Sequence, residues 1–279
     1  MVEALPEGEP VRGVALLDDI IYVLRDKAAH QLEAYDVETY KLQRLQTVPN
    51  ARGFTDMASC QHYHNVYMSD HIIKCIHRLD SQNNIRQWPV NDTPACISVN
   101  VVRNLLVTCS DVGKIKEFSA NGYYLRDIHL PRGVVNPRHA VELRTGELIV
   151  CHGSSSRNDP IHRVCVVSPD GCQIVQSHGG YKGSNPGQYN GPRHLAVDDN
   201  ECVFVVDAFN WRVTLLSPTL NYIRQVVTRR ELNRWPGRLC LDVQSQRLYV
   251  TDNDVTDGKT TSGRVVVFNV ATEGQLASS

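Results

Sequence analysis

The feature that most constrains the fold is a unit of short apolar runs that recurs six times along the 279 residues. In each unit one apolar run follows a proline or a turn, a second follows soon after, and a third opens with a polar or basic residue before an apolar one. The third runs open at Gln31, Lys74, Lys114, Arg163, Arg212 and Arg264, at spacings of 43, 40, 49, 49 and 52 residues. A more polar run closes most units. A period of about 40–50 residues with four strands per unit is typical of a β-propeller blade.

The repeat predicts an all-β protein, a six-bladed β-propeller of four-stranded antiparallel blades in a single domain over residues 1–279. One blade cannot bury both faces of its sheet, so neighbouring blades must pack face to face until the ring closes. We expect the blades at about residues 11–48, 54–90, 93–130, 136–179, 191–227 and 235–270.

The sixth unit lacks a fourth apolar run, because the chain after GRVVVFNV is small and polar. We expect residues 1–5 to supply the missing outer strand, so that both ends of the chain share one blade and no sheet edge stays open. The alternative is a frayed N-terminus and a three-stranded sixth blade.

Charge and cysteine content narrow the classes of function. The 29 basic and 30 acidic residues give a net charge of −1, so a nucleic-acid or phosphate site would need a local basic patch. No apolar run is long enough to span a membrane, and the start MVEALPEGEP does not read as a signal peptide. The nine cysteines are odd in number and form no CxxC pair, which argues against a disulfide framework and a zinc ribbon. We expect reduced thiols and a cytoplasmic protein, with an oxidising compartment as the alternative.

The fifth unit carries the most specific motif. A glycine-containing loop runs into Pro192 and is followed by HLAVDDNECVFVVDAFNWRV. This unit resembles the NHL repeat at Asp198, Asp207, Asn210, Arg212 and Val213. The sixth unit matches in part, at Pro236, Asp242, Asp252 and Arg264-Val265, and the first four units are degenerate.

The resemblance implies a propeller that serves as a binding platform. NHL propellers form the C-terminal module of TRIM-type ubiquitin ligases and bind RNA or protein, and they also form the catalytic domain of the peptide-amidating lyase. The likeness therefore implies a substrate-recruiting module of a larger ligase if the natural chain is longer.

The residues that begin each inner strand surround the central funnel, where ligands of propellers usually converge. At two successive positions the units place basic and imidazole side chains there, and these are the predicted ligand-binding residues: Arg12, Arg138, His139, Arg193, His194 and Arg238. Guanidinium groups suit carboxylate or phosphate because they form forked hydrogen bonds. The alternative is that the arginines pair with local carboxylates, and Asp56 could neutralise one of them.

The same face carries a second set of basic residues in the turns before the third strands. A basic rim with an exposed aromatic ring could hold single-stranded RNA by phosphate contact and stacking. The residues predicted for this alternative are Lys74, Lys114, Arg157, Trp211 and Lys259. Aspartates share these turns, which is more typical of a solvated surface, and Asp207 with Arg212 fits a brace within the blade.

We expect no enzyme, no cofactor and no metal. The amidating lyase requires histidine directly after the proline, where this chain has Arg138 and Arg193, and His139 and His194 are shifted by one residue. We expect these histidines to form hydrogen bonds near the funnel wall rather than to bind zinc. A lactonase-type site needs several inward carboxylates, and Asp56 is the one clear candidate. A metal-dependent lyase or lactonase is the second alternative.

Two turns are longer than the repeat requires, at residues 152–163 and 253–264. The first of them could overhang the funnel as a lid or be a tolerated insertion. Taken together, the sequence predicts a monomeric platform whose funnel binds a partner protein, an acidic peptide or another anion, with RNA as the alternative ligand and no membrane contact.

Overall fold

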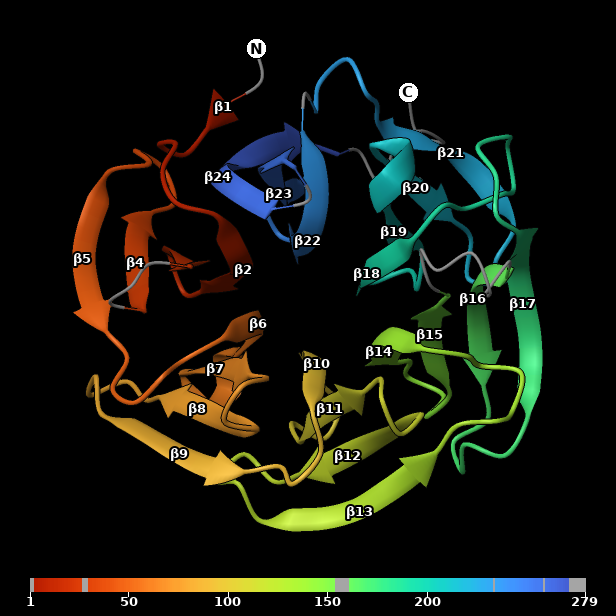
Figure 1. Cartoon of the computed structure of the whole chain (residues 1–279), viewed down its shortest axis with the longest axis horizontal. Coiled ribbons are helices and arrows are strands. Elements are labelled where there is room, and N and C mark those ends of the chain that lie inside the picture. The colour runs from red at the N-terminus through yellow and green to blue at the C-terminus, as the bar shows by residue number, and fades with distance from the viewer. Residues whose placement is uncertain (1–2, 27–29, 154–160, 233, 258, 271–279) are drawn as a thin grey trace.

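The protein is a ring of six four-stranded antiparallel sheets around a central axis (Figure 1). The computed structural model describes residues 3–26, 30–153, 161–232, 234–257 and 259–270. No helix in these ranges is long and apolar enough to cross a membrane. The predicted fold class, a six-bladed all-β propeller, is confirmed.

Blades 1 to 5 are each built from four consecutive strands, and in every blade the strands are arranged side by side from the axis outward. Blade 1 contains β2 (Val11–Leu17), β3 (Ile20–Arg25), β4 (Gln31–Asp36) and β5 (Leu42–Thr47). Blade 2 contains β6 (Phe54–Cys60), β7 (Asn65–Asp70), β8 (Cys75–Leu79) and β9 (Ile85–Pro89). Blade 3 contains β10 (Pro94–Val99), β11 (Leu105–Cys109), β12 (Lys114–Phe118) and β13 (Tyr124–His129).

The other three blades repeat the order. Blade 4 contains β14 (Pro137–Glu142), β15 (Leu148–His152), β16 (Ile161–Val167) and β17 (Ile174–Tyr181). Blade 5 contains β18 (Pro192–Val197), β19 (Val203–Asp207), β20 (Arg212–Leu216) and β21 (Tyr222–Val227). Blade 6 contains β22 (Trp235–Asp242), β23 (Arg247–Thr256), β24 (Lys259–Asn269) and the N-terminal β1 (Glu3–Ala4). Short 3-10 turns follow β6 (Gln61–Tyr63) and β19 (Ala208–Asn210).

The apolar core lies between the blades. The buried hydrophobic residues form six clusters, and each cluster joins the facing sheets of two neighbouring blades. The second strands β7, β11, β15 and β19 are buried along their whole length, whereas the outer strands are largely exposed. This explains the sequence pattern, because a strand covered on both faces appears as a continuous apolar run.

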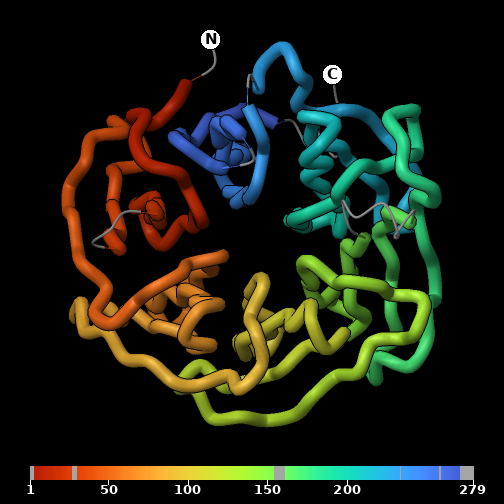
Figure 2. The backbone as a smooth tube through the Cα atoms, viewed as in Figure 1, coloured from red at the N-terminus to blue at the C-terminus, as the bar shows by residue number. Residues whose placement is uncertain are grey.

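The N-terminal segment closes the ring. Figure 2 shows the start of the chain lying beside the last blade, where β1 pairs with β24. Glu3 pairs with Val267 and Ala4 with Val266, and the Leu5 amide donates to the Val265 carbonyl over 2.8 Å. The predicted closing strand is confirmed for residues 3 and 4, while residues 1 and 2 lie outside the described part. The sixth blade is therefore four-stranded.

The register of the third strands differs from the sequence prediction in blade 2. Cys75, the partner of Asp70, occupies the place that Arg212 holds opposite Asp207 in blade 5. Lys74 lies one residue earlier, in the turn, with a positive φ of 53° like that of Trp211 at 55°. The sequence pattern placed Lys74 at the start of the third strand, whereas Lys74 occupies the left-handed position of the turn before it and Cys75 begins the strand.

A buried arginine fastens the closing segment. Arg25 ends β3 at the position where blades 2, 5 and 6 carry aspartate, and it is only 1% exposed. Its Nε donates to Glu33 Oε2 at 2.6 Å, and its Nη atoms donate to the carbonyl oxygens of Pro6, Glu9 and Gly263. One guanidinium therefore joins blade 1, blade 6 and the segment that follows β1.

We expect Arg25→Met to destabilise the protein by about 3–5 kcal/mol, because it removes the buried ion pair with Glu33 and three hydrogen bonds to backbone carbonyl oxygens. Chemical unfolding measures the loss. The matched control is Arg247→Met, which removes a partly exposed ion pair with Glu38 and should change stability by less than about 1 kcal/mol. Equal losses in the two variants would show that Arg25 does not hold the closure.

Candidate anion-binding funnel

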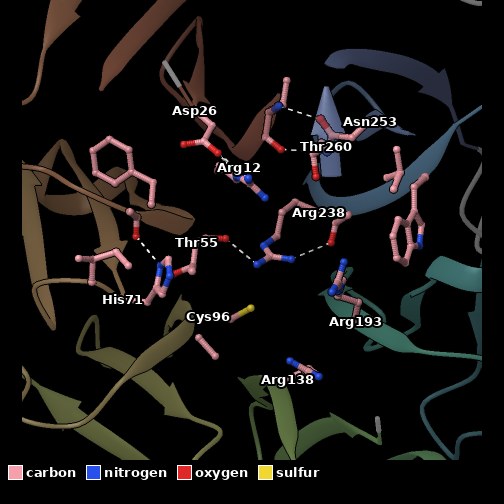
Figure 3. Close-up of a pocket in the computed structure, with 18 of the residues that line it drawn as sticks. Arg12, Asp26, Thr55, His71, Cys96, Arg138, Arg193, Arg238, Asn253 and Thr260 are labelled. Atoms are coloured by element: carbon pink, nitrogen blue, oxygen red, sulfur yellow. Dashed lines mark hydrogen bonds and ion pairs between the residues drawn. The ribbon is translucent and has the colours of Figure 1, made fainter. Parts of the chain in front are cut away.

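A cavity of about 660 Å³ lies on the axis at the face where the inner strands begin (Figure 3). The four predicted arginines all line it: Arg12 from β2, Arg138 from β14, Arg193 from β18 and Arg238 from β22. The ring thus brings together side chains that are up to 226 positions apart in the sequence, the separation of Arg12 and Arg238. Its volume is in the range of small-molecule sites, about 300–1,000 Å³.

A repeated β-bulge aims these side chains at the axis. The inner strands of blades 1 to 5 shift register at their second position, for example between Val11 and Gly13, between Pro137 and His139, and between Pro192 and His194. The residue in the bulge has no cross-strand partner, and a bulge redirects the side chain it carries. Arg12, Arg138 and Arg193 occupy this position in their blades, while blade 6 shifts between Pro236 and Leu239, on either side of Arg238.

Two of the four arginines are neutralised by carboxylates. The guanidinium of Arg12 pairs with Asp26 over 2.5 Å at the side of the cavity. Arg238 Nε pairs with the buried Asp56 over 2.9 Å, and its Nη2 donates to the Thr55 carbonyl oxygen at 2.5 Å. Burial would raise the pKa of Asp56, but His194 and Arg238 reverse this and hold it well below its usual range. The expected neutralisation by Asp56 thus falls on Arg238.

The other two arginines have no carboxylate partner among the described residues. Arg193 lies over the Trp235 ring, 5.4 Å from its centroid, and Arg138 makes no hydrogen bond or ion pair within the described part of the chain. Burial, together with the charges of Arg238 and Arg138, lowers the pKa of Arg193 to about 10. The Arg193 guanidinium remains charged at neutral pH in a place that disfavours its charge.

The two predicted histidines lie beneath the cavity and do not line it. His139 is 2% exposed and His194 is 5% exposed, and their rings stack at a centroid distance of 3.9 Å. His139 Nδ1 accepts from the Leu195 amide at 3.1 Å, and His194 Nδ1 accepts from the Leu239 amide at 3.4 Å. Each histidine therefore ties its blade to the next. His139 and His194 therefore fit the expectation of hydrogen bonds near the funnel wall, and they are not placed to contact a ligand in the cavity.

Asp56 takes the same place in blade 2. Its Oδ2 accepts from the Ile97 amide of blade 3 at 2.9 Å, and His194 Nε2 donates to the same oxygen at 3.4 Å. His139 Nε2 donates to the Ile97 carbonyl oxygen at 3.2 Å. Asp56 and the two histidines thus link five blades beneath the arginines.

The cluster of Asp56, His139 and His194 has the composition of a metal site, and its candidate ligand atoms lie within 4.8 Å of one another. The hydrogen bonds do not fit this use. A backbone N–H can only donate, so each Nδ1 must keep its lone pair and each Nε2 must carry the proton. A metal on Nε2 needs the opposite tautomer, in which Nδ1–H faces an acceptor. The residues present do not suit a metal ion.

The residues predicted for RNA binding are less available than the sequence implied. Lys114 is paired with Asp92 at 3.0 Å and Asp127 at 2.8 Å, which raises its pKa. Arg229 covers the ring of Trp211, with its guanidinium carbon 4.2 Å from the ring centroid. Lys74 and Lys259 lie outside the cavity lining, and Arg157 lies outside the described residues.

Several lining residues were missed from the sequence. Trp235, Val255 and Thr260 line the cavity from blade 6, and Ile72 lines it from blade 2. Asp26 and His71 also belong to the lining and are labelled in Figure 3. The long turn of blade 6 continues β23 and β24 to Thr256 and Lys259, so this turn does contribute to the funnel. The turn of blade 4 falls largely outside the described residues. Trp235 was detectable, since it directly precedes the proline of an inner strand.

The fold is shared with enzymes of different chemistries. A streptogramin B lyase matches with a TM-score of 0.65 at 12% identity, over 98% of this chain and 88% of that chain. A putative gluconolactonase matches with a TM-score of 0.66 at 13% identity, over 97% and 94%. The PQQ-bound aldose sugar dehydrogenase of Streptomyces coelicolor matches with a TM-score of 0.65 at 13% identity, over 96% and 98%.

The likeness at these identities is to the propeller fold alone. No family model matches the sequence, and no curated protein matches it. The chain is a six-bladed propeller that shares its fold with these proteins, and its chemistry has to be argued from its own residues.

Stability should fall below about pH 6.5. Burial lowers the pKa of His139 and of His194, so the unfolded chain binds protons at a pH where the folded chain does not. Stability is then complete above the unfolded value and decreases as the pH falls, by up to about 1.4 kcal/mol per pH unit for each histidine. Urea unfolding between about pH 5 and pH 7.5 measures the slope.

Two glutamine variants test the cause of this slope. His139→Gln should make the free energy of unfolding depend less steeply on pH. The control is His129→Gln, which replaces an exposed histidine and should leave the slope unchanged. An unaltered slope in His139→Gln would contradict the assignment of a neutral ring.

One equivalent of Zn²⁺ should leave the melting temperature unchanged, because neither buried histidine can offer an Nε2 lone pair while its Nδ1 accepts a backbone N–H. Thermal unfolding with Zn²⁺ and with a chelator tests this. A stabilisation by zinc that disappears in His139→Gln would overturn the argument.

Proposed function

We propose that this chain is a non-catalytic binding platform whose funnel holds an anionic group of a partner protein, an acidic peptide or a small molecule. The observation that carries the proposal is the set of five guanidinium groups around one cavity, of which Arg138 and Arg193 are partly buried and have no carboxylate partner among the described residues. An anion would relieve the unfavourable burial of the Arg193 charge and could accept forked hydrogen bonds.

The chemistry of the other lining residues supports binding rather than catalysis. Burial raises the pKa of the Cys96 thiol well above its usual range, so this lining cysteine stays protonated and weakly nucleophilic. His139 and His194 have both ring nitrogens engaged beneath the cavity. The lyase and lactonase neighbours keep a propeller enzyme as the alternative.

The NHL resemblance of blades 5 and 6 supports a more specific form of the proposal. Asp207 with Arg212 and Asp252 with Arg264 form the brace pairs within these blades, at 2.8 Å and 3.0 Å. On this basis we propose a cytoplasmic, monomeric recruiting module of a TRIM-type ubiquitin ligase. Single-stranded RNA on the basic rim is the competing ligand.

The test compares an acidic peptide with RNA. Fluorescence anisotropy would use labelled octaglutamate and labelled oligouridylate of the same length. We expect octaglutamate to bind and Arg193→Gln to weaken it about tenfold or more, because a hydrogen bond to a charged group contributes about 1.5–3 kcal/mol.

The matched control is Arg86→Gln, which removes an exposed arginine of the outer strand β9 and should leave binding unchanged. Binding of oligouridylate that weakens steeply with salt and is lost in Lys74→Glu would favour the RNA alternative. Equal losses in Arg86→Gln and Arg193→Gln would remove the funnel from the proposal.

A further inference from the structure

The charges of the funnel floor do not cancel. Five guanidinium groups line the cavity, and two carboxylates, Asp26 and Asp56, pair with two of them, Arg12 and Arg238. The other three have no carboxylate partner in the described part of the chain, and of these Arg138 and Arg193 are partly buried whereas Arg52 is exposed. Near Arg52, His71 donates from Nδ1 to the Gly53 carbonyl oxygen.

Arg138 and Arg193 lie in adjacent blades and share more than the main cavity. Both also line a smaller recess, together with Gly153, Gly191 and Phe209. Figure 3 shows Arg138 at the bottom and Arg193 at the right of the cavity, with Arg12 and Asp26 toward the top. The charge of Arg138 contributes to the lowered pKa of Arg193, so the two guanidinium groups interact electrostatically.

The part of the cavity beside them is apolar on one side. The Trp235 ring lies under Arg193 and is packed against Phe209 at a centroid distance of 4.5 Å. Val255 of β23, in the same blade as Trp235, also lines the cavity, whereas Ile72 belongs to blade 2 on the far side of the ring. An aromatic or aliphatic group attached to an anion would therefore find apolar contacts next to the guanidinium pair.

We propose that the funnel selects a doubly charged anionic group, a phosphate monoester or a pair of neighbouring carboxylates, carried on an apolar body and held between Arg138 and Arg193. This inference rests on the proposed anion-binding function and specifies the ligand of that site. Arg12 and Arg238 hold their places through Asp26 and Asp56 and contribute less to the discrimination, because their charges are already compensated.

Matched pairs of small anions test the selectivity. Phenyl phosphate carries nearly two charges above about pH 7, because its second pKa is close to 6, and methyl phenyl phosphate carries one on the same aromatic group. Succinate and succinamate form the corresponding carboxylate pair. Isothermal titration should show binding of at least one dianion about tenfold or more tighter than its monoanion, and the two pairs distinguish phosphate from dicarboxylate.

Variants locate the selectivity within the funnel. Arg138→Gln and Arg193→Gln should each weaken the dianion by about tenfold and bring its affinity close to that of the monoanion. Arg12→Gln should weaken binding of the dianion and of its matched monoanion by similar factors, each smaller than tenfold. Circular dichroism and thermal unfolding confirm that each variant folds.

The outcomes separate the two proposals. If each dianion binds within about threefold of its monoanion, or if Arg12→Gln loses as much discrimination as Arg193→Gln, the selectivity is wrong while anion binding stands. If none of the four anions and no octaglutamate binds the unaltered protein, both the selectivity and the proposed function are wrong.

Discussion

A blade of this propeller can bury its two apolar faces only against its neighbours, and the ring must therefore close. The six interblade clusters are the direct consequence, since each contains residues from two facing sheets. Closure is completed by β1 on β24 and by Arg25, whose guanidinium reaches three carbonyl oxygens from the closing segment and blade 6. Without this closure the arginines of blades 1 and 6 would have no common cavity.

Closure also decides the chemistry at the axis. A register shift recurs in every inner strand, by one residue in blades 1 to 5 and by two in blade 6. In blades 2, 4 and 5 the residue after the bulge bonds to the neighbouring blade. Asp56, His139 and His194 use that position to accept backbone N–H groups from adjacent inner strands. The bulge therefore separates a ligand-facing layer of guanidinium groups from a structural layer of hydrogen-bonded side chains directly beneath it.

The distinction between these layers explains why the fold alone does not indicate the function. Similar folds are found in a streptogramin B lyase, a putative gluconolactonase and a PQQ-bound aldose sugar dehydrogenase, all at 12–13% identity to this chain. In this chain the histidines and the aspartate at the axis have their lone pairs and protons committed to the backbone and to one another. What remains exposed to a ligand is positive charge with an apolar wall, which favours recognition of an anion.

The sequence by itself determined the number of blades, the four-stranded unit, the closing N-terminal strand and the position of the arginines at the funnel. These follow from period and apolar pattern, because every blade must bury the same kind of surface. The register slip at Lys74, the covering of Trp211 by Arg229 and the pairing of Lys114 were not evident, since local patterns do not show which charges meet. Only the tertiary structure decided that Arg12 and Arg238 are neutralised while Arg138 and Arg193 are not. The reason is that Asp56 reaches Arg238 across the axis, a contact between residues 182 positions apart in the sequence.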